Sequence, residues 1–127
     1  MTIVGISSAD APAAIGPYSP GVKIGNLVFL SGQIPIDPTT GNIIPGDIKT
    51  QTHQVFRNIA ALLKASGATS RNIVRTTVFL ADMDEFAVMN EVYASYVDDP
   101  PPARSTVQVA RLPKDVRVEI DVIAVVD

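Results

Sequence analysis

The stretch that most constrains the fold is the run from Val116 to Val126 near the end of the chain, VRVEIDVIAVV. Apolar residues fill every second position, which is the two-residue period of a β-strand. The opposite face of the strand is half charged and half apolar, with Glu119 in its middle. The first face suits the space beneath a helical layer. We expect the second face to be buried against neighbouring subunits, with a polar pocket at one end.

The same patterns predict the other elements. Expected strands and helices are, in order, strand 2–6, strands 22–24 and 27–34 around a Gly25-Asn26 turn, helix 48–66, strand 72–81, a helix from about 82 that stops at the prolines 100–102, and strands 104–110 and 116–126. This order predicts an α+β fold in which a mixed sheet carries both helices on one face.

Capping signals and apolar periodicity support the two helices. Asp47 can begin the first helix and Gly67 can end it. Asp82 and Glu85 have the spacing of a capping box for the second. His53, the only histidine, lies away from the apolar stripe of the first helix. We expect it to be a solvated residue, which leaves no histidine-based triad or metal site.

Composition narrows the class of protein. The 127 residues suit one domain spanning residues 1–127, and the charged fraction of 18% is below the usual value of about 25%. Such a surface is expected to be partly covered by another subunit. The net charge is −3 without a basic run, so nucleic acid is not an expected partner. With no cysteine, disulfides and thiolate nucleophiles are excluded.

Neither a signal peptide nor a membrane span is expected. The first residues lack a basic region followed by a long apolar run, and no segment approaches the roughly 20 apolar residues of a membrane helix. The expected location is the cytoplasm, although the sequence does not separate it from the mitochondrion.

Two charged residues stand where a plain core strand would carry none. Arg104 follows three prolines and begins a strand; its guanidinium can bind a carboxylate with two hydrogen bonds, or it can be a surface residue or part of a structural ion pair. Glu119, between Val118 and Ile120, can act as an acid–base group, or it can form a salt bridge with Arg117 or Arg111. Position alone favours the structural alternative for both.

Two uncharged residues have similar alternatives. Asn90 lies on the inner side of the second helix, and a buried asparagine needs hydrogen-bond partners. It can cap a loop or shape a pocket. Tyr18 lies between Pro17 and Pro20 in a stiff loop, where it can form a lid or simply pack.

Taken together, several motifs resemble the reactive-intermediate deaminase family, also called RidA or YjgF. The motifs are IGPYSP, VFLSGQIP, PARSTVQVARLP and VRVEIDVIA. The segments QTHQVFRNIAALLKASGA and LADMDEFAVMNEVYASY look like the two helices of that family, so the likeness covers nearly the whole chain. Its most specific part is Pro102-Ala103-Arg104-Ser105 followed by Val118-Glu119-Ile120 at the spacing of the family.

The resemblance implies a homotrimer with a chorismate-mutase-like fold and active sites in the clefts between subunits. It implies hydrolysis of reactive 2-imino acids, such as 2-iminobutanoate and 2-iminopropanoate, to 2-oxo acids and ammonia, without metal or cofactor. Pyridoxal-phosphate enzymes release these imines and can be damaged by them.

The resemblance also assigns roles to residues. Arg104 and Glu119 would be catalytic: Arg104 would grip the substrate carboxylate, and Glu119 would orient the attacking water and shuttle protons to the leaving nitrogen. The other substrate-binding positions would be the lid Tyr18, the ligand neighbours Ser31 and Gly32, the wall residue Asn90, and Thr106, whose backbone would contact the imine. Many relatives carry cysteine where this chain has Thr106.

Two other functions stay open. One is a regulatory module that binds small carboxylates such as 2-oxo acids without turnover, which would require Arg104 alone. The other is an endoribonuclease that inhibits translation, as some relatives are described. The acidic balance of the chain argues against the second alternative.

Overall fold

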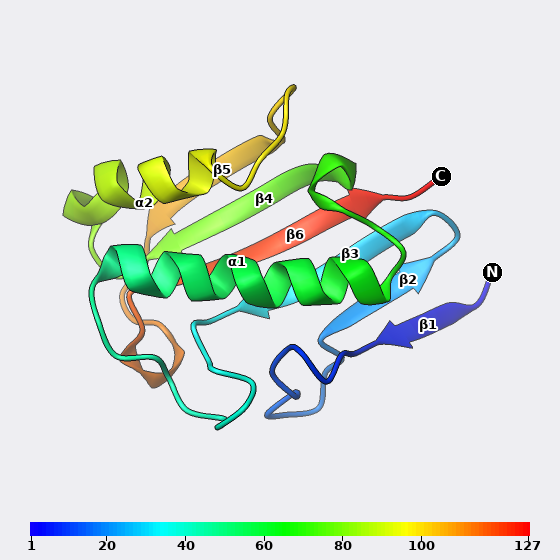
Figure 1. Cartoon of the computed structure of the whole chain (residues 1–127), viewed down its shortest axis with the longest axis horizontal. Helices are drawn as coiled ribbons and strands as arrows, with labels where there is room; N and C mark the ends of the chain where they lie inside the picture. Colours follow the sequence, from blue (N-terminus) through cyan, green and yellow to red (C-terminus); the bar gives the residue numbers. More distant parts are fainter.

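A six-stranded mixed sheet with two α-helices on one of its faces forms the molecule, as the computed structural model of all 127 residues shows (Figure 1). The strands are β1 (Ile3–Ile6), β2 (Gly21–Ile24), β3 (Leu27–Gln33), β4 (Ile73–Leu80), β5 (Ala103–Gln108) and β6 (Val118–Val125). They lie in the order β1-β2-β3-β6-β4-β5. Only β4 and β5 pair in parallel; the other pairs are antiparallel. The expected α+β class and element order are confirmed.

The first helix begins and ends at the expected signals. Helix α1 (Ile48–Ala65) follows Asp47, whose side chain accepts a hydrogen bond from the Thr50 amide at 2.9 Å. It stops before Gly67, whose φ of 80° suits glycine best. The helix crosses the sheet and packs on β6 and β3, which fixes its place over the centre of the molecule (Figure 1).

The second helix is shorter than expected and is capped differently. Helix α2 (Phe86–Ala94) is preceded by a 3₁₀ turn, Met83–Glu85. Asp82 accepts a hydrogen bond from Asp84 N at 2.9 Å, but the Glu85 side chain pairs with Arg117 at 3.0 Å. The expected capping box is therefore wrong, because the ion pair with Arg117, just before β6, takes the carboxylate that would have closed it.

The alternation of the last strand has the expected effect on burial. Strand β6 lies between β3 and β4. The side chains from Val118 to Ala124 that face the helices are almost completely buried, and Glu119 and its neighbours on the other face are half-buried. The strand begins two residues later than expected, because Val116 follows the 3₁₀ turn Pro113–Asp115 and packs elsewhere.

Two apolar clusters result. The main core of 21 residues fills the space between sheet and helices. A smaller cluster, which we call the minor core, consists of Ile34, Ile36, Leu112 and Val116. It lies at the end of the sheet where β3 stops and β6 begins, so it packs next to Glu119.

The environment of His53 differs from the expectation. Its side chain is half-buried, and its Nδ1 lies 2.7 Å from the Tyr96 hydroxyl. The expectation of a solvated histidine was wrong because the segment after α2 folds back over α1, a contact that no local pattern reveals. Neither helix is long and apolar enough to cross a membrane.

Candidate active site

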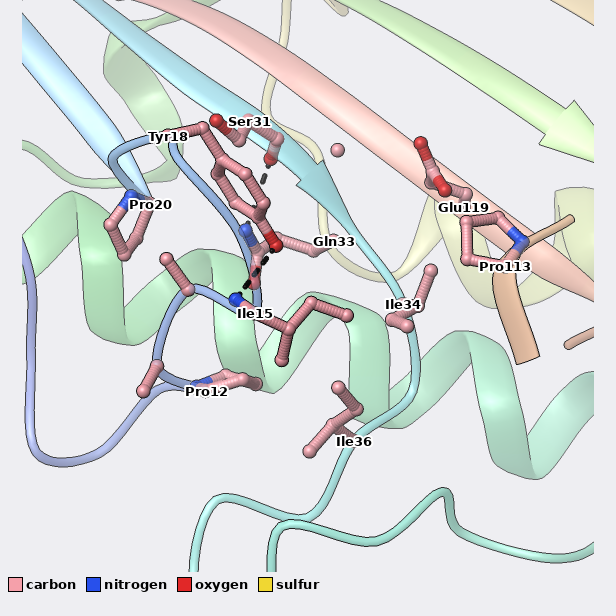
Figure 2. Close-up of a pocket in the computed structure, with 13 residues that line it drawn as sticks. Pro12, Ile15, Tyr18, Pro20, Ser31, Gln33, Ile34, Ile36, Pro113 and Glu119 are labelled. Atoms are coloured by element: carbon pink, nitrogen blue, oxygen red, sulfur yellow. Dashed lines mark hydrogen bonds between the residues drawn. The ribbon is translucent and has the colours of Figure 1, made fainter.

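A pocket of about 300 Å³ opens between the loop before β2, the end of β3 and the start of β6 (Figure 2). Four residues singled out from the sequence line it: Tyr18, Ser31, Gly32 and Glu119. The remaining walls are largely apolar and are formed by Pro12, Ala13, Ala14, Ile15, Pro20, Gln33, Ile34, Ile36 and Pro113. The pocket therefore surrounds one ionisable carboxyl with apolar side chains and a few hydroxyl groups.

Hydrogen bonds fix the loop that carries Tyr18. Ser31 donates through its amide to the Pro20 carbonyl at 2.9 Å and through its hydroxyl to the Ser19 carbonyl at 2.7 Å. The Tyr18 hydroxyl accepts a hydrogen bond from Ile15 N at 3.3 Å (Figure 2). Half of Tyr18 is exposed. The tyrosine thus lies at the mouth of the pocket on a loop tied to the sheet.

An irregularity in β3 brings Gly32 against Glu119. Leu30 pairs with Val122 and Gln33 with Ile120, so two residues of β3 lie opposite one residue of β6. This is a β-bulge, which bends a strand and re-aims its side chains. A Cβ atom at Gly32 would lie 2.8 Å from the Glu119 carboxyl carbon. A larger residue at this position would therefore displace the Glu119 carboxyl.

Glu119 has no partner in the chain. Its carboxylate makes no hydrogen bond or ion pair, and the arginines that could have paired with it are engaged elsewhere: Arg117 with Glu85 at 3.0 Å and Arg111 with Asp115 at 2.7 Å. The salt-bridge alternative is therefore wrong. Burial, and secondarily the nearby charge of Asp121, raises the pKa of the Glu119 carboxyl above its ordinary value.

A second cluster surrounds Arg104 on β5. Its guanidinium lies over the Tyr93 ring at 4.6 Å and near the Phe86 ring at 5.5 Å, and Nη1 donates to Asn90 Oδ1 at 2.7 Å. No carboxylate pairs with it. The hydroxyl of Thr106, two residues further on the same strand face, is buried without a hydrogen-bond partner. This cluster holds an oriented cation with free hydrogen-bond donors.

The two clusters lie on opposite faces of the sheet. Arg104 is in register with Thr76, which is buried beneath the helices, whereas Glu119 is in register with Phe79, which packs against the minor core. Strand β4 separates β5 from β6, which places the two backbones about 10 Å apart. A small molecule cannot contact both side chains within one chain.

Some site neighbours were not identified from the sequence. The spacing of Phe86, Asn90 and Tyr93 did place them on one side of α2, but nothing indicated that Arg104 would lie against that side. Pro113, in the wall near Glu119, ends the motif PARSTVQVARLP but was not singled out as a site residue. No group of three or more histidine, cysteine, aspartate or glutamate side chains is placed to hold a metal ion.

The pocket holds an unpaired carboxyl of raised pKa, and a separate arginine on the same mixed sheet is oriented to bind an anion. These features define a candidate acid–base site for a small anionic molecule. Residues 8–126 match the family model described as Endoribonuclease L-PSP, and the chain belongs to this family, which is the RidA/YjgF family.

Individual relatives match along almost their whole length. A RutC family protein of Pyrococcus horikoshii is 55% identical over 119 residues, 94% of each chain. A mouse protein named 2-iminobutanoate/2-iminopropanoate deaminase is 46% identical, over 94% of this chain and 89% of its own. The solved structure of RidA from an Antarctic Psychrobacter bacterium is 45% identical with a TM-score of 0.93, and covers 97% of this chain and 99% of that one.

Proposed function

We propose that this protein hydrolyses reactive 2-imino acids, such as 2-iminobutanoate and 2-iminopropanoate, to 2-oxo acids and ammonia. The observation that carries the proposal is the half-buried Glu119 carboxyl, which has no partner and a raised pKa beside an open pocket. A residue with only a structural role would be paired. The name of the mouse relative supports the same reaction.

The chemistry needs placement of water and proton transfer more than a strong nucleophile, because an imine carbon is already electrophilic. Water adds to the C=N carbon, and Glu119 accepts its proton. The nitrogen takes up protons and leaves as ammonia while the C=O bond forms. No electrons are gained or lost, so the reaction requires no redox cofactor. A raised pKa suits a carboxyl that must both accept and return a proton.

Arg104 would bind the substrate carboxylate. Its Nη1 is held by Asn90 and its plane lies against Tyr93, so its remaining donors are oriented before a ligand arrives. A two-pronged arginine–carboxylate contact fixes a small acid in both position and rotation. The backbone near Thr106 would contact the imine end, and Tyr18, Ser31 and Gly32 would surround the ligand on the opposite side.

We further propose that the active protein is a homotrimer in which the Arg104 cluster of one subunit faces the Glu119 pocket of the next. The separation of the two clusters on opposite sheet faces supports this arrangement, because a single chain cannot use both on one small substrate. A heterologous contact that closes into a ring generates such shared sites.

The test is a coupled assay in which a pyridoxal-phosphate dehydratase produces 2-iminobutanoate and release of the 2-oxo acid is followed. The natural chain should accelerate hydrolysis. Arg104→Ala and Glu119→Gln should each lose it while remaining folded, with a loss on the order of 10²–10⁴-fold for Glu119→Gln. Glu119→Gln should still bind a 2-oxo acid, because Arg104 is unchanged.

The same preparations address the two other functions. A carboxylate-binding module would bind the 2-oxo acid and show no acceleration by any variant. A ribonuclease would cleave RNA after rigorous purification, and its activity would depend on salt as contacts to phosphates do. The net charge of −3 and the absence of a basic run disfavour RNA as the substrate.

A further inference from the structure

The inner side of α1 carries three buried amide side chains that the proposed mechanism does not use. They are Gln51, Gln54 and Asn58, all at most 6% exposed. Buried amides are costly unless they are hydrogen-bonded. All three make hydrogen bonds, and the backbone groups that Gln51 and Asn58 bind lie outside α1, in segments next to the Glu119 pocket.

Asn58 binds the chain where it leaves β3. Its Nδ2 donates to the carbonyls of Ile34 and Ile36 at 3.2 and 2.9 Å. These carbonyls lie beyond the end of β3 at Gln33, where no neighbouring strand supplies a regular ladder of donors. Gln54 donates to Asn58 Oδ1 at 2.9 Å, which turns the NH₂ group of Asn58 toward the two carbonyls.

Gln51 binds two further segments, two turns before Asn58 on the helix. Its Nε2 donates to the Ile44 carbonyl at 3.1 Å, and its Oε1 accepts a hydrogen bond from Arg117 N at 2.9 Å. Arg117 lies directly between Val116 of the minor core and the start of β6. The single amide thus joins the end of the loop after β3 to the chain that leads into Glu119.

The segments held in this way form the wall around the carboxyl. Ile34, Ile36 and Pro113 line the pocket with Glu119 (Figure 2), and the two isoleucines belong to the minor core with Leu112 and Val116. This apolar wall keeps water from one side of the carboxyl. Its position relative to Glu119 depends on backbone that is irregular and attached to α1 through amide side chains.

We infer that Asn58 and Gln51 are positioning residues for Glu119, because they hold the two backbone segments whose side chains wall its carboxylate. Neither touches the substrate in this account; both act through the minor core. Their effect on catalysis rests on the proposed function, whereas their effect on the carboxyl itself does not.

Other ionisable groups near Glu119 are few. Asp121 lies on the same strand and raises the pKa of Glu119, and Tyr18 lies in the same pocket. Arg111 and Asp115, in the loop that holds Pro113, pair with each other, and Arg117 pairs with Glu85. The apolar wall is therefore the main feature that an α1 variant would change around the carboxyl.

The test uses Asn58→Leu and Gln51→Met, which keep approximate size and remove the amide contacts. The control is Thr52→Val on the same helix: Thr52 is completely buried, but its hydroxyl donates only to the Ile48 carbonyl of α1 itself at 2.7 Å. Titration of the Glu119 side-chain carboxyl is followed by NMR in the assembled protein, together with kcat and KM for 2-iminobutanoate across pH.

We expect the Glu119 pKa to fall toward its ordinary value in both variants, because a loosened wall admits water, and to stay unchanged in Thr52→Val. The acid limb of the kcat profile should move to lower pH, and kcat should fall by roughly 10–10²-fold with little change in KM. An unchanged Glu119 titration in the folded variants would overturn the inference. Loss of folding in both would also overturn it, since the amides would then serve the fold alone.

The outcomes separate this inference from the proposed function. If the natural chain does not hydrolyse imines but its Glu119 titration still shifts in both variants, the proposed function fails and the positioning role stands. If the natural chain hydrolyses imines but the Glu119 titration is unchanged in the Asn58 and Gln51 variants, the proposed function stands and the positioning role fails.

Discussion

At the scale of the residue, the most informative feature is a carboxylate that the fold isolates. Glu119 is half-buried, lacks a partner, and lies so close to the Gly32 backbone that a Cβ atom at position 32 would displace its carboxyl group. Groups of this kind usually reduce stability and persist where they serve a site. Two changes test this directly, one on the carboxyl and one on the glycine beneath it.

Glu119→Gln should stabilise the protein at neutral pH. Burial raises the folded-state pKa above the ordinary 4.5, so the protonated form is favoured more in the folded chain than in the unfolded chain. The contribution of that proton to stability is fully present below pH 4.5 and is lost as the pH rises through the raised pKa. The neutral amide avoids this loss.

The melting temperature of Glu119→Gln should therefore exceed that of the natural chain at neutral pH, and the difference should vanish in acid. Glu91→Gln, on the exposed side of α2 without an ion pair, is the control and should change nothing. A Glu119→Gln variant that melts lower at neutral pH would show that the carboxylate has a stabilising partner after all.

Gly32→Ala should displace the Glu119 carboxyl without unfolding the chain. The added methyl would lie 2.8 Å from the carboxyl carbon and 3.1 Å from Cγ, so the flexible end of the glutamate must move. A displacement of this size costs on the order of 10² in turnover. Gly5→Ala, whose nearest neighbour would be Ser19 Oγ at 3.8 Å, should be silent. Equal rates for both variants would contradict the close-approach argument.

At the scale of the element, the sequence predicted whatever depends on local pattern. The period of β6, the cap of α1 at Asp47 and its stop before Gly67 are properties of neighbouring residues, and the structure agrees with them. Two of the failures involve contacts between distant segments. The Glu85 side chain pairs with Arg117 instead of closing the capping box, and His53 contacts Tyr96. Sequence spacing does not reveal side-chain partners that come from distant parts of the chain.

The candidate site follows the same division. The motifs singled out the residues of both clusters, and local alternation placed Arg104 and Thr106 on one strand face. Arg104 lies under α2 on the helical side of the sheet, and Glu119 lies on the other side. Placing them there requires knowledge of the strand order β6-β4-β5. Strand order depends on long-range pairing, which one sequence does not specify.

Tyr96→Phe tests the contact that joins α1 to the segment after α2. The ring stacks on Phe56 at 4.6 Å and its hydroxyl meets His53 Nδ1 at 2.7 Å. Phenylalanine keeps the stack and loses the hydrogen bond, so the free energy of unfolding should fall by about 1 kcal/mol. His53→Ala in the Tyr96→Phe background should cost less than it does alone. Turnover should be unchanged throughout; a loss of more than a few-fold would place this contact in the site.

At the scale of the whole molecule, the sheet face away from the helices exposes large apolar side chains beside its charged ones. Three of them are each about 40% exposed: Leu27 and Phe29 on β3, and Val107 on β5. Together with a charged fraction of 18%, this face supports the proposal that other copies of the chain cover it. Sedimentation of the natural chain at micromolar concentration should give a trimer, and a fully active monomer would contradict the proposal.

The central claim is that Arg104 of one subunit and Glu119 of another form one site, and subunit mixing tests it most directly. Arg104→Ala and Glu119→Gln chains, each inactive alone, are unfolded, mixed in equal amounts and refolded together. If every site takes its arginine and its glutamate from different chains, about one quarter of the sites in randomly mixed rings receive both natural residues. The account predicts that activity returns to about a quarter of the natural value. Mixed trimers without activity would contradict it.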